Sequence, residues 1–107
     1  MTQEEFIEVL KEKGYSYRIE GDKILVTHRE FVNLESLTSL PPGVEFKNGG
    51  YVDLESLTSL PPGVQFENGG NVYLSGLGWV GDNEGIRIEG VDTKRLLNFM
   101  IGKGIFI

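Results

Sequence analysis

The sequence contains a single histidine, His28, the side chain best suited to act as a general base near neutral pH. A carboxylate at Glu30 or Asp22 would have to orient its imidazole. The chain has no cysteine to serve as a nucleophile or thiolate ligand, and no second histidine to share a metal ion. An enzyme using His28 with Glu30 or Asp22 is therefore kept only as a third hypothesis. We expect no catalytic residue, no metal site and no cofactor.

The segment Asp82–Asn83–Glu84 gathers oxygen-bearing side chains of the kind that bind Ca²⁺. It lacks the ligand spacing of an EF-hand loop, and a solvated turn is the simpler interpretation. The glycines match no phosphate-binding pattern, because no Gly-Lys-Ser or Gly-Lys-Thr follows a strand. The polar residues therefore indicate no active site.

The charge balance excludes one class of partner. Of the 107 residues, 10 are Lys or Arg and 16 are Asp or Glu, which gives a formal net charge of −6. Nucleic-acid binding needs clustered basic side chains, so a direct nucleic-acid partner is not expected. Residues 32–80 hold five acidic side chains and one basic side chain, so the negative excess lies in this stretch.

The sequence indicates neither export nor membrane insertion. Glu4, Glu5 and Glu8 are acidic where a signal peptide would be basic, and no apolar run approaches the ~20 residues of a membrane span. The absence of cysteine fits a reducing compartment. We expect a cytoplasmic chain with no membrane partner.

A 20-residue repeat is the most specific feature of the chain. Residues 32–51 and 52–71 are identical at 16 of 20 positions. Apolar residues alternate at Val52 and Leu54 and again at Val64 and Phe66, which predicts two short strands in each repeat. The Pro-Pro-Gly and Asn-Gly-Gly segments between these strands predict corners.

One repeat is too short to bury its own apolar side chains and must stack on its neighbours. The expected fold is mainly β with capping helices (α+β): a short β-solenoid of about three 20-residue coils. Ile86 and Ile88 are expected to take the places of Val64 and Phe66 in a last, irregular coil. An antiparallel β meander is the alternative, because Asn-Gly dipeptides at residues 48–49 and 68–69 are also typical of hairpins.

Both ends of the stack are expected to carry helical caps within a single domain, residues 1–107. Thr2 and Glu5 form a capping-box pattern for a helix that ends near Lys13. Asp92 or Thr93 is expected to start a second helix, whose apolar residues are Leu96, Leu97, Met100 and Ile101. Residues 1–31 thus hold the first helix and strands, residues 32–80 the repeats, and residues 81–107 a strand, a helix and a tail. The tail Ile105–Ile107 is expected either to pack or to anchor a partner.

The run Leu57–Pro61, Leu-Thr-Ser-Leu-Pro, resembles the same element of bacterial leucine-rich repeats, which share the 20-residue period. The pattern differs in one respect, since Leu57 stands where those repeats have asparagine. The whole unit is more similar to the LTSLPxGVxFxNGGxVxL coils of phage and prophage repeat proteins. This resemblance implies a mobile-element origin, a bacterial host and no particular chemistry.

Outward-facing residues of the repeats are the candidate partner-binding set. The four positions that differ between the two best repeats are all expected to face solvent, where they would define a surface. Acidic and aromatic side chains dominate there, and Trp79 is expected to seal the last coil. The candidate partner-binding residues are Glu35, Tyr51, Asp53, Glu55, Glu67 and Tyr73.

The leading functional hypothesis is a non-enzymatic protein-binding module. Together with the resemblance, it describes a small acidic phage or prophage protein that binds and inhibits a host factor, such as a CRISPR-type defence effector (an anti-CRISPR or other anti-defence protein). The partner would be a host protein that itself binds nucleic acid, and the chain would be a monomer or homodimer. The alternative is a structural or assembly accessory protein that forms a homo-oligomer.

Overall fold

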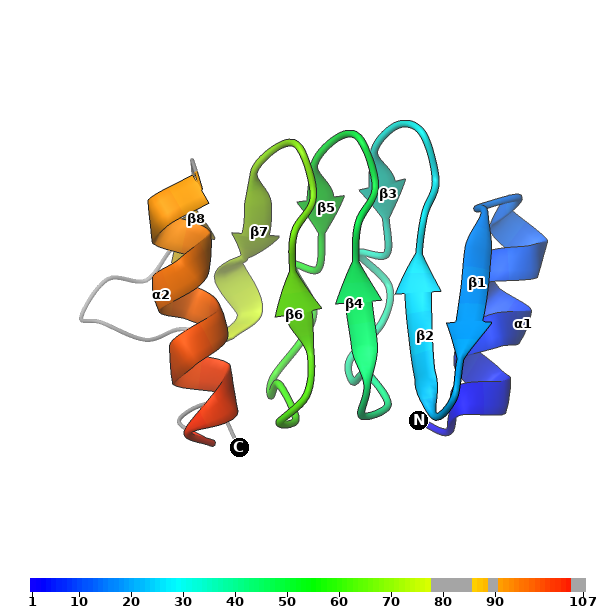
Figure 1. Ribbon diagram of the computed structural model, residues 1–107, viewed down its shortest axis with the longest axis horizontal. Helices are drawn as coiled ribbons and strands as arrows, with labels where there is room; N and C mark the ends of the chain where they lie inside the picture. Colours follow the sequence, from blue (N-terminus) through cyan, green and yellow to red (C-terminus); the bar gives the residue numbers. More distant parts are fainter. Residues whose placement is uncertain (78–85, 89–90, 105–107) are drawn as a thin grey trace.

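A computed structural model describes residues 1–77, 86–88 and 91–104 of the chain. Figure 1 shows two sheets, one in front of the other, with a helix at each end of the pair. The elements, in chain order, are α1 (Gln3–Lys13), β1 (Tyr17–Glu20), β2 (Lys23–Val26), β3 (Val32–Asn33), β4 (Val44–Phe46), β5 (Val52–Asp53), β6 (Gln65–Phe66), β7 (Val72–Leu74), the 3-10 helix η1 (Ser75–Leu77), β8 (Ile86–Ile88) and α2 (Val91–Gly102). The fold class is α+β.

Each sheet has four strands, in the orders β1-β2-β4-β6 and β3-β5-β7-β8. The pairs β2–β4, β4–β6, β3–β5 and β5–β7 are all parallel. Asp53 lies opposite Asn33 on one side and Tyr73 on the other, so the register step is one 20-residue repeat. β4 and β5 lie in different sheets, and the antiparallel meander considered from the sequence is therefore wrong.

The strand β8 is antiparallel to β7 and places Ile88 opposite Val72. The expectation that Ile86 and Ile88 would take the places of Val64 and Phe66 is therefore wrong. β8 joins the sheet of β7, whereas Phe66 belongs to β6 in the other sheet. Two apolar residues on either side of one polar residue fit either sheet and either strand direction. The sheet of β3, β5 and β7 therefore ends in an antiparallel strand, β8.

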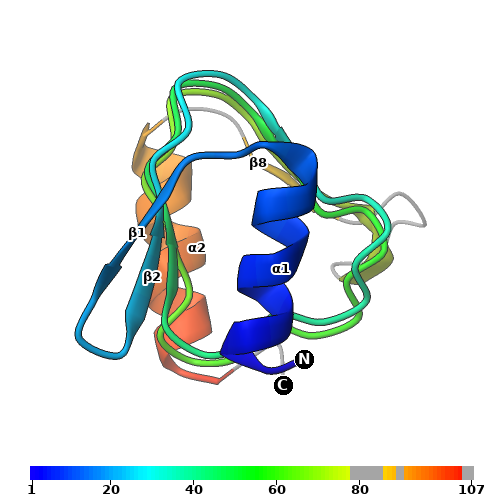
Figure 2. The same ribbon diagram turned by 90° about the vertical axis from the view of Figure 1, so that its right-hand side faces the viewer.

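The core lies between the two sheets and is made of the same side chains in successive repeats. Val32, Val52 and Val72 are each fully buried. Phe46 and Phe66 stack with ring centroids 5.1 Å apart and planes 4° from parallel. Figure 2, which looks along the stack, shows successive repeats superimposed and α1 across the end of the space between the sheets.

The helix α1 begins with the predicted capping box. The Thr2 hydroxyl accepts from the Glu5 amide at 3.1 Å, and the Glu5 carboxylate accepts from the Thr2 amide at 3.0 Å. The helix ends at Gly14, whose φ of 73° is left-handed. Phe6 and Leu10 are fully buried, so α1 covers the first repeat as expected.

The helix α2 also covers an end of the stack, but two details differ from the expectation. It begins at Val91, so Asp92 and Thr93 lie within its first turn. Leu97 and Ile101 are buried, whereas Leu96 is 58% exposed and does not join the apolar face. Neither helix in the described ranges has the length and hydrophobicity to cross a bilayer. Trp79 and the tail Ile105–Ile107 lie outside these ranges.

The Asn-Gly-Gly corners hold adjacent repeats in close contact. The Asn68 amide nitrogen donates to the carbonyls of Gly50 and Gly70, both at 3.0 Å, and Asn48 makes the equivalent contacts one repeat earlier. A Cβ atom on Gly69 would lie 2.6 Å from the carbonyl oxygen of Gly49. Glycine is therefore required at this corner by the proximity of the neighbouring backbone.

Replacing Gly69 by Ala tests this close contact. The added methyl group would meet backbone of the adjacent repeat, which can move only with that repeat. We expect the free energy of unfolding to fall by about 1–3 kcal/mol, measured by urea denaturation. Gly102→Ala is the control, because a Cβ atom there meets nothing within 4 Å. Equal losses of stability in the two variants would contradict the explanation.

Candidate protein-binding face

Outward side chains of β3, β5 and β7 form rows across the sheet. Successive residues of a strand point to opposite faces, and the buried valines at positions 32, 52 and 72 define the inner face. Asn33, Asp53 and Tyr73 are therefore outward, and the 20-residue register aligns them. A second row, at positions 31, 51 and 71, directly precedes the buried valines. The glutamates at positions 35 and 55 follow β3 and β5.

The second row, at positions 31, 51 and 71, is aromatic at two of its three positions. The rings of Phe31 and Tyr51 stack with centroids 4.9 Å apart and planes 6° from parallel. Tyr51 also meets Tyr73 edge-on, with centroids 5.8 Å apart and planes at 72°. Phe31 is 44% exposed. Sequence reasoning missed Phe31, although its position 20 residues before Tyr51 was a sufficient signal.

Three carboxylates lie beside these rings. Each of Glu35, Asp53 and Glu55 offers an oxygen atom within 4.8 Å of the other two. The two glutamates are held by the same local turn. The Asp53 carboxylate accepts from the Glu55 amide at 3.2 Å, and the Asn33 side-chain oxygen accepts from the Glu35 amide at 3.0 Å.

We call Phe31, Glu35, Tyr51, Asp53, Glu55 and Tyr73 the acidic–aromatic face. Within the described part of the chain, no Lys or Arg forms an ion pair with its three carboxylates. Partial burial raises the pKa of Tyr51, and the charge of Asp53 adds to the effect. Such an arrangement can hold a hard cation through oxygen ligands, or a cationic side chain of a partner.

Glu67 is the one candidate residue that the structure separates from the others. It follows β6 in the other sheet and lies 3.5 Å from the Lys47 ammonium. Lys47 also lies 3.9 Å from Glu45, which forms a 3.0 Å ion pair with Lys23. The hydrogen bond and the charge of Glu45 raise the pKa of Lys23. The negative charge of Glu67 is thus balanced locally.

Glu45 also corrects the expectation that every position differing between the repeats faces solvent. The residue is only 7% exposed, whereas the equivalent Gln65 is exposed. Two lysines, Lys23 and Lys47, lie beside its carboxylate and make the burial possible. Lys23 precedes the repeats, so repeat comparison alone could not reveal this contact.

His28, which follows β2, contacts the segment that joins α1 to β1. Its Nδ1 atom accepts from the Ser16 amide at 3.3 Å, and its ring lies 4.9 Å from that of Tyr15. Among the described residues, no carboxylate is bonded to the imidazole, although Glu30 lines the same shallow hollow. The Asp82–Glu84 segment lies outside the described residues.

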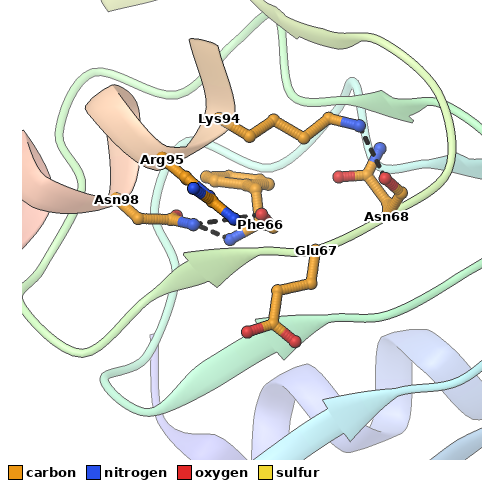
Figure 3. A pocket seen from close by; sticks show the side chains of 6 residues that line it. All are labelled: Phe66, Glu67, Asn68, Lys94, Arg95 and Asn98. Carbon is orange, nitrogen blue, oxygen red and sulfur yellow. Dashed lines mark hydrogen bonds between the residues drawn. The ribbon is translucent and has the colours of Figure 1, made fainter. Parts of the chain in front are cut away.

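A cavity of about 250 Å³ between α2 and β6 is lined by Phe66, Glu67, Asn68, Lys94, Arg95 and Asn98 (Figure 3). Asn98 makes two hydrogen bonds to the backbone of Phe66: its Oδ1 accepts from the amide at 2.7 Å and its Nδ2 donates to the carbonyl at 3.1 Å. The Lys94 ammonium donates to the Asn68 carbonyl. Figure 3 shows Glu67 pointing away from these groups.

These contacts reproduce those that a further repeat would make. The Asn98 amide presents a donor and an acceptor to β6, as a neighbouring strand does. The Lys94 ammonium bonds the Asn68 carbonyl, whereas the equivalent Asn48 carbonyl accepts from the Gly69 amide at 2.9 Å. Two polar side chains that line the cavity, Asn98 and Lys94, are therefore engaged in ending the stack.

Comparisons of the chain with protein-family models, with curated proteins and with solved structures find no match. Function has to be inferred from the acidic–aromatic face itself.

Lys94 should make stability depend on pH in a particular direction. Burial lowers the pKa of Lys94 below its ordinary value of 10.5. Between the folded and unfolded pKa values the unfolded state binds more protons, so stability rises with pH in that window. We expect the stability of the wild type, relative to Lys94→Met, to increase as the pH rises toward 10.5, the ordinary pKa of lysine. Urea denaturation at a series of pH values measures this difference.

The matched control is Lys13→Met, at an exposed position on α1. Its stability difference from the wild type should change little over the same pH range. A flat difference for Lys94→Met as well would contradict the assignment of a buried ammonium.

Proposed function

We propose that this chain is a non-enzymatic protein-binding module whose acidic–aromatic face docks on a basic surface of another protein. The observation that carries the proposal is the position of three carboxylates, none ion-paired with a described Lys or Arg, beside stacked, partly exposed aromatic rings. Interfaces are enriched in tyrosine, and tyrosine and carboxylates together suit a cationic partner. Glu67, paired with Lys47 on the other sheet, is left out of this face.

Arginine is the partner side chain that fits this face best. Its guanidinium binds a carboxylate through two parallel hydrogen bonds and also stacks on an aromatic ring. Tyr51 provides such a ring within the row that adjoins Asp53, and Glu35 and Glu55 lie within 4.8 Å of the Asp53 carboxylate. A lysine ammonium would gain the charge interaction alone. The partner surface is therefore proposed to be rich in arginine.

The scaffold behind the face is proposed to be a short β-solenoid of about three coils. Parallel pairing at a 20-residue offset in both sheets supports this interpretation. So does the recurrence of Val32, Val52 and Val72 as a buried row. Such stacking fixes the spacing of outward side chains along the stack at about 4.8 Å, which limits the entropy lost on binding.

The biological form of the proposal is a phage or prophage protein that inhibits a host defence effector. It is supported by the similarity of the repeats to phage and prophage coils and by the net charge of −6. CRISPR-type effectors hold nucleic acid in positively charged channels. An acidic face presented to such a channel would compete with the phosphate backbone. The chain itself would bind neither nucleic acid nor membrane.

The test begins with affinity capture from the lysate of a defence-competent bacterium, followed by titration of the purified partner. The triple variant Glu35→Gln, Asp53→Asn, Glu55→Gln should weaken binding by about 10- to 100-fold, because it removes all three charges at nearly constant shape. Tyr51→Ala should weaken it by about 10-fold through loss of the stacked ring. Isothermal titration calorimetry measures both effects.

Glu67→Gln is the matched control, since it removes one negative charge outside the face and should leave affinity within about twofold of the wild type. Raising the ionic strength from about 0.05 M to about 0.5 M should weaken the wild-type complex. An affinity that does not change with salt would exclude the electrostatic mechanism. Equal losses in Glu67→Gln and the triple variant would place the interface elsewhere.

A further inference from the structure

The outer edge of β1 differs from the edges of β3 and β6, where side chains bond the outward backbone groups. At β3, the Tyr15 hydroxyl accepts from the Asn33 amide at 3.0 Å and lies 3.4 Å from the Asn33 carbonyl. At β6, the Asn98 amide bonds both backbone groups of Phe66. β8 pairs with β7 and forms the fourth sheet edge. No segment in the described ranges pairs with the outer edge of β1, the first strand of its sheet.

The hairpin register identifies which backbone groups are free on this edge. The Thr27 amide donates to the Ser16 carbonyl at 3.0 Å, so residues 16 and 27 form a hydrogen-bonded pair. Such pairs alternate along an antiparallel ladder. The amide and carbonyl groups of Arg18 and Glu20 therefore face β2, and those of Tyr17 and Ile19 point away from it.

Charge then selects one way in which two copies of this edge can pair. Antiparallel pairing can place Ile19 opposite Tyr17, Ile19 or Gly21 of a second copy. With Ile19 opposite Tyr17, Arg18 meets Arg18. With Ile19 opposite Gly21, Glu20 meets Glu20, and the pairing runs past the end of β1 into the hairpin turn, where Gly21 has a φ of 63°. Only the register with Ile19 opposite Ile19 places Arg18 opposite Glu20 on both sides of the two-fold axis. Opposite charges stabilise such pairs and like charges destabilise them.

We propose that the chain forms a two-fold homodimer through antiparallel pairing of β1 with β1 of a second copy, centred on Ile19. The sheet of β1, β2, β4 and β6 in one copy then joins the same sheet of the second copy to form one continuous eight-stranded sheet. The proposal is independent of the binding function assigned to the acidic–aromatic face, which lies on the other sheet.

Exposure at this edge fits the same pairing. Arg18, Ile19 and Glu20 are all exposed, and Ile19, at 55%, is among the large apolar side chains that the structure leaves in solvent. Figure 2 shows α1 over the space between the sheets and β1 to one side of it, so the helix does not cover this edge. Dimerisation would bring two Ile19 side chains together. The Arg18–Glu20 ion pair, 2.7 Å within one strand, would extend to four charges.

Disulfide trapping tests both the contact and its register, because the chain contains no cysteine of its own. Arg18→Cys and Glu20→Cys chains are prepared separately and then mixed under mild oxidation. The proposed register places position 18 of one copy opposite position 20 of the other, within disulfide reach. The mixture should give at least about fivefold more linked dimer than either variant alone. Lys103→Cys, on the opposite end of the stack, measures random collisional linkage.

Charge reversal provides a second measurement that needs no cross-link. In sedimentation equilibrium the wild type should dimerise as its concentration is raised. Arg18→Glu should weaken the dimer by about 10-fold or more, and the double variant Arg18→Glu, Glu20→Arg should restore it. Circular dichroism confirms that each variant keeps its fold, which is expected because both side chains are exposed.

Two results would overturn the proposal. One is a wild type that stays monomeric at every concentration, with linkage in the mixture no higher than in the Lys103→Cys control. The other is preferential linkage in either single variant alone, which would show a different register.

Discussion

Hydrogen bonds between backbone groups of successive repeats underlie every other feature of this fold. The Val32 amide donates to the Tyr51 carbonyl and the Val52 amide to the Asn71 carbonyl, both at 2.9 Å. These bonds hold equivalent residues of successive repeats in line, so side chains that could not be buried within one repeat are buried between repeats. The corners must then approach as closely as the strands do. That requirement explains why a Cβ atom at Gly69 would meet the backbone of the preceding repeat.

A stack held together in this way leaves unpaired backbone groups at both ends, and side chains from outside the repeats satisfy several of them. Asn98 bonds the Phe66 amide and carbonyl, Lys94 bonds the Asn68 carbonyl, and the Tyr15 hydroxyl bonds the backbone of Asn33. Each replaces groups that a neighbouring repeat would supply. The buried ammonium costs desolvation energy, which its hydrogen bond to a carbonyl only partly offsets. Side-chain capping of this kind ends a stack without a further strand.

Features that depend on the repeat or on local sequence could be predicted, and features that depend on contacts outside the repeat could not. The 20-residue identity predicted the register and the buried rows, and Thr2 with Glu5 predicted the start of α1. The predicted position of β8 was wrong, because alternating apolar residues indicate a strand but not the strand with which it pairs. Lys94 and Asn98 were missed because their backbone partners lie 26 and 32 residues away. The carboxylates of the acidic–aromatic face were predicted from the repeat. Glu67 was wrongly grouped with them, although its ion-pair partner Lys47 occupies the equivalent position of the preceding repeat.

The corner glycines and the terminal side chains have a consequence for how such a chain can evolve. Because each repeat contacts only the repeats beside it, an in-frame duplication of one unit between residues 51 and 52 would lengthen both sheets by one strand. The cap residues at the two ends would keep their own partners. The surface would grow by one outward row whose residues can then diverge, as Asn33 and Asp53 already have. Unequal recombination between near-identical repeats is therefore a route by which the outward surface of the repeats can gain or lose area in whole units while the termini stay unchanged.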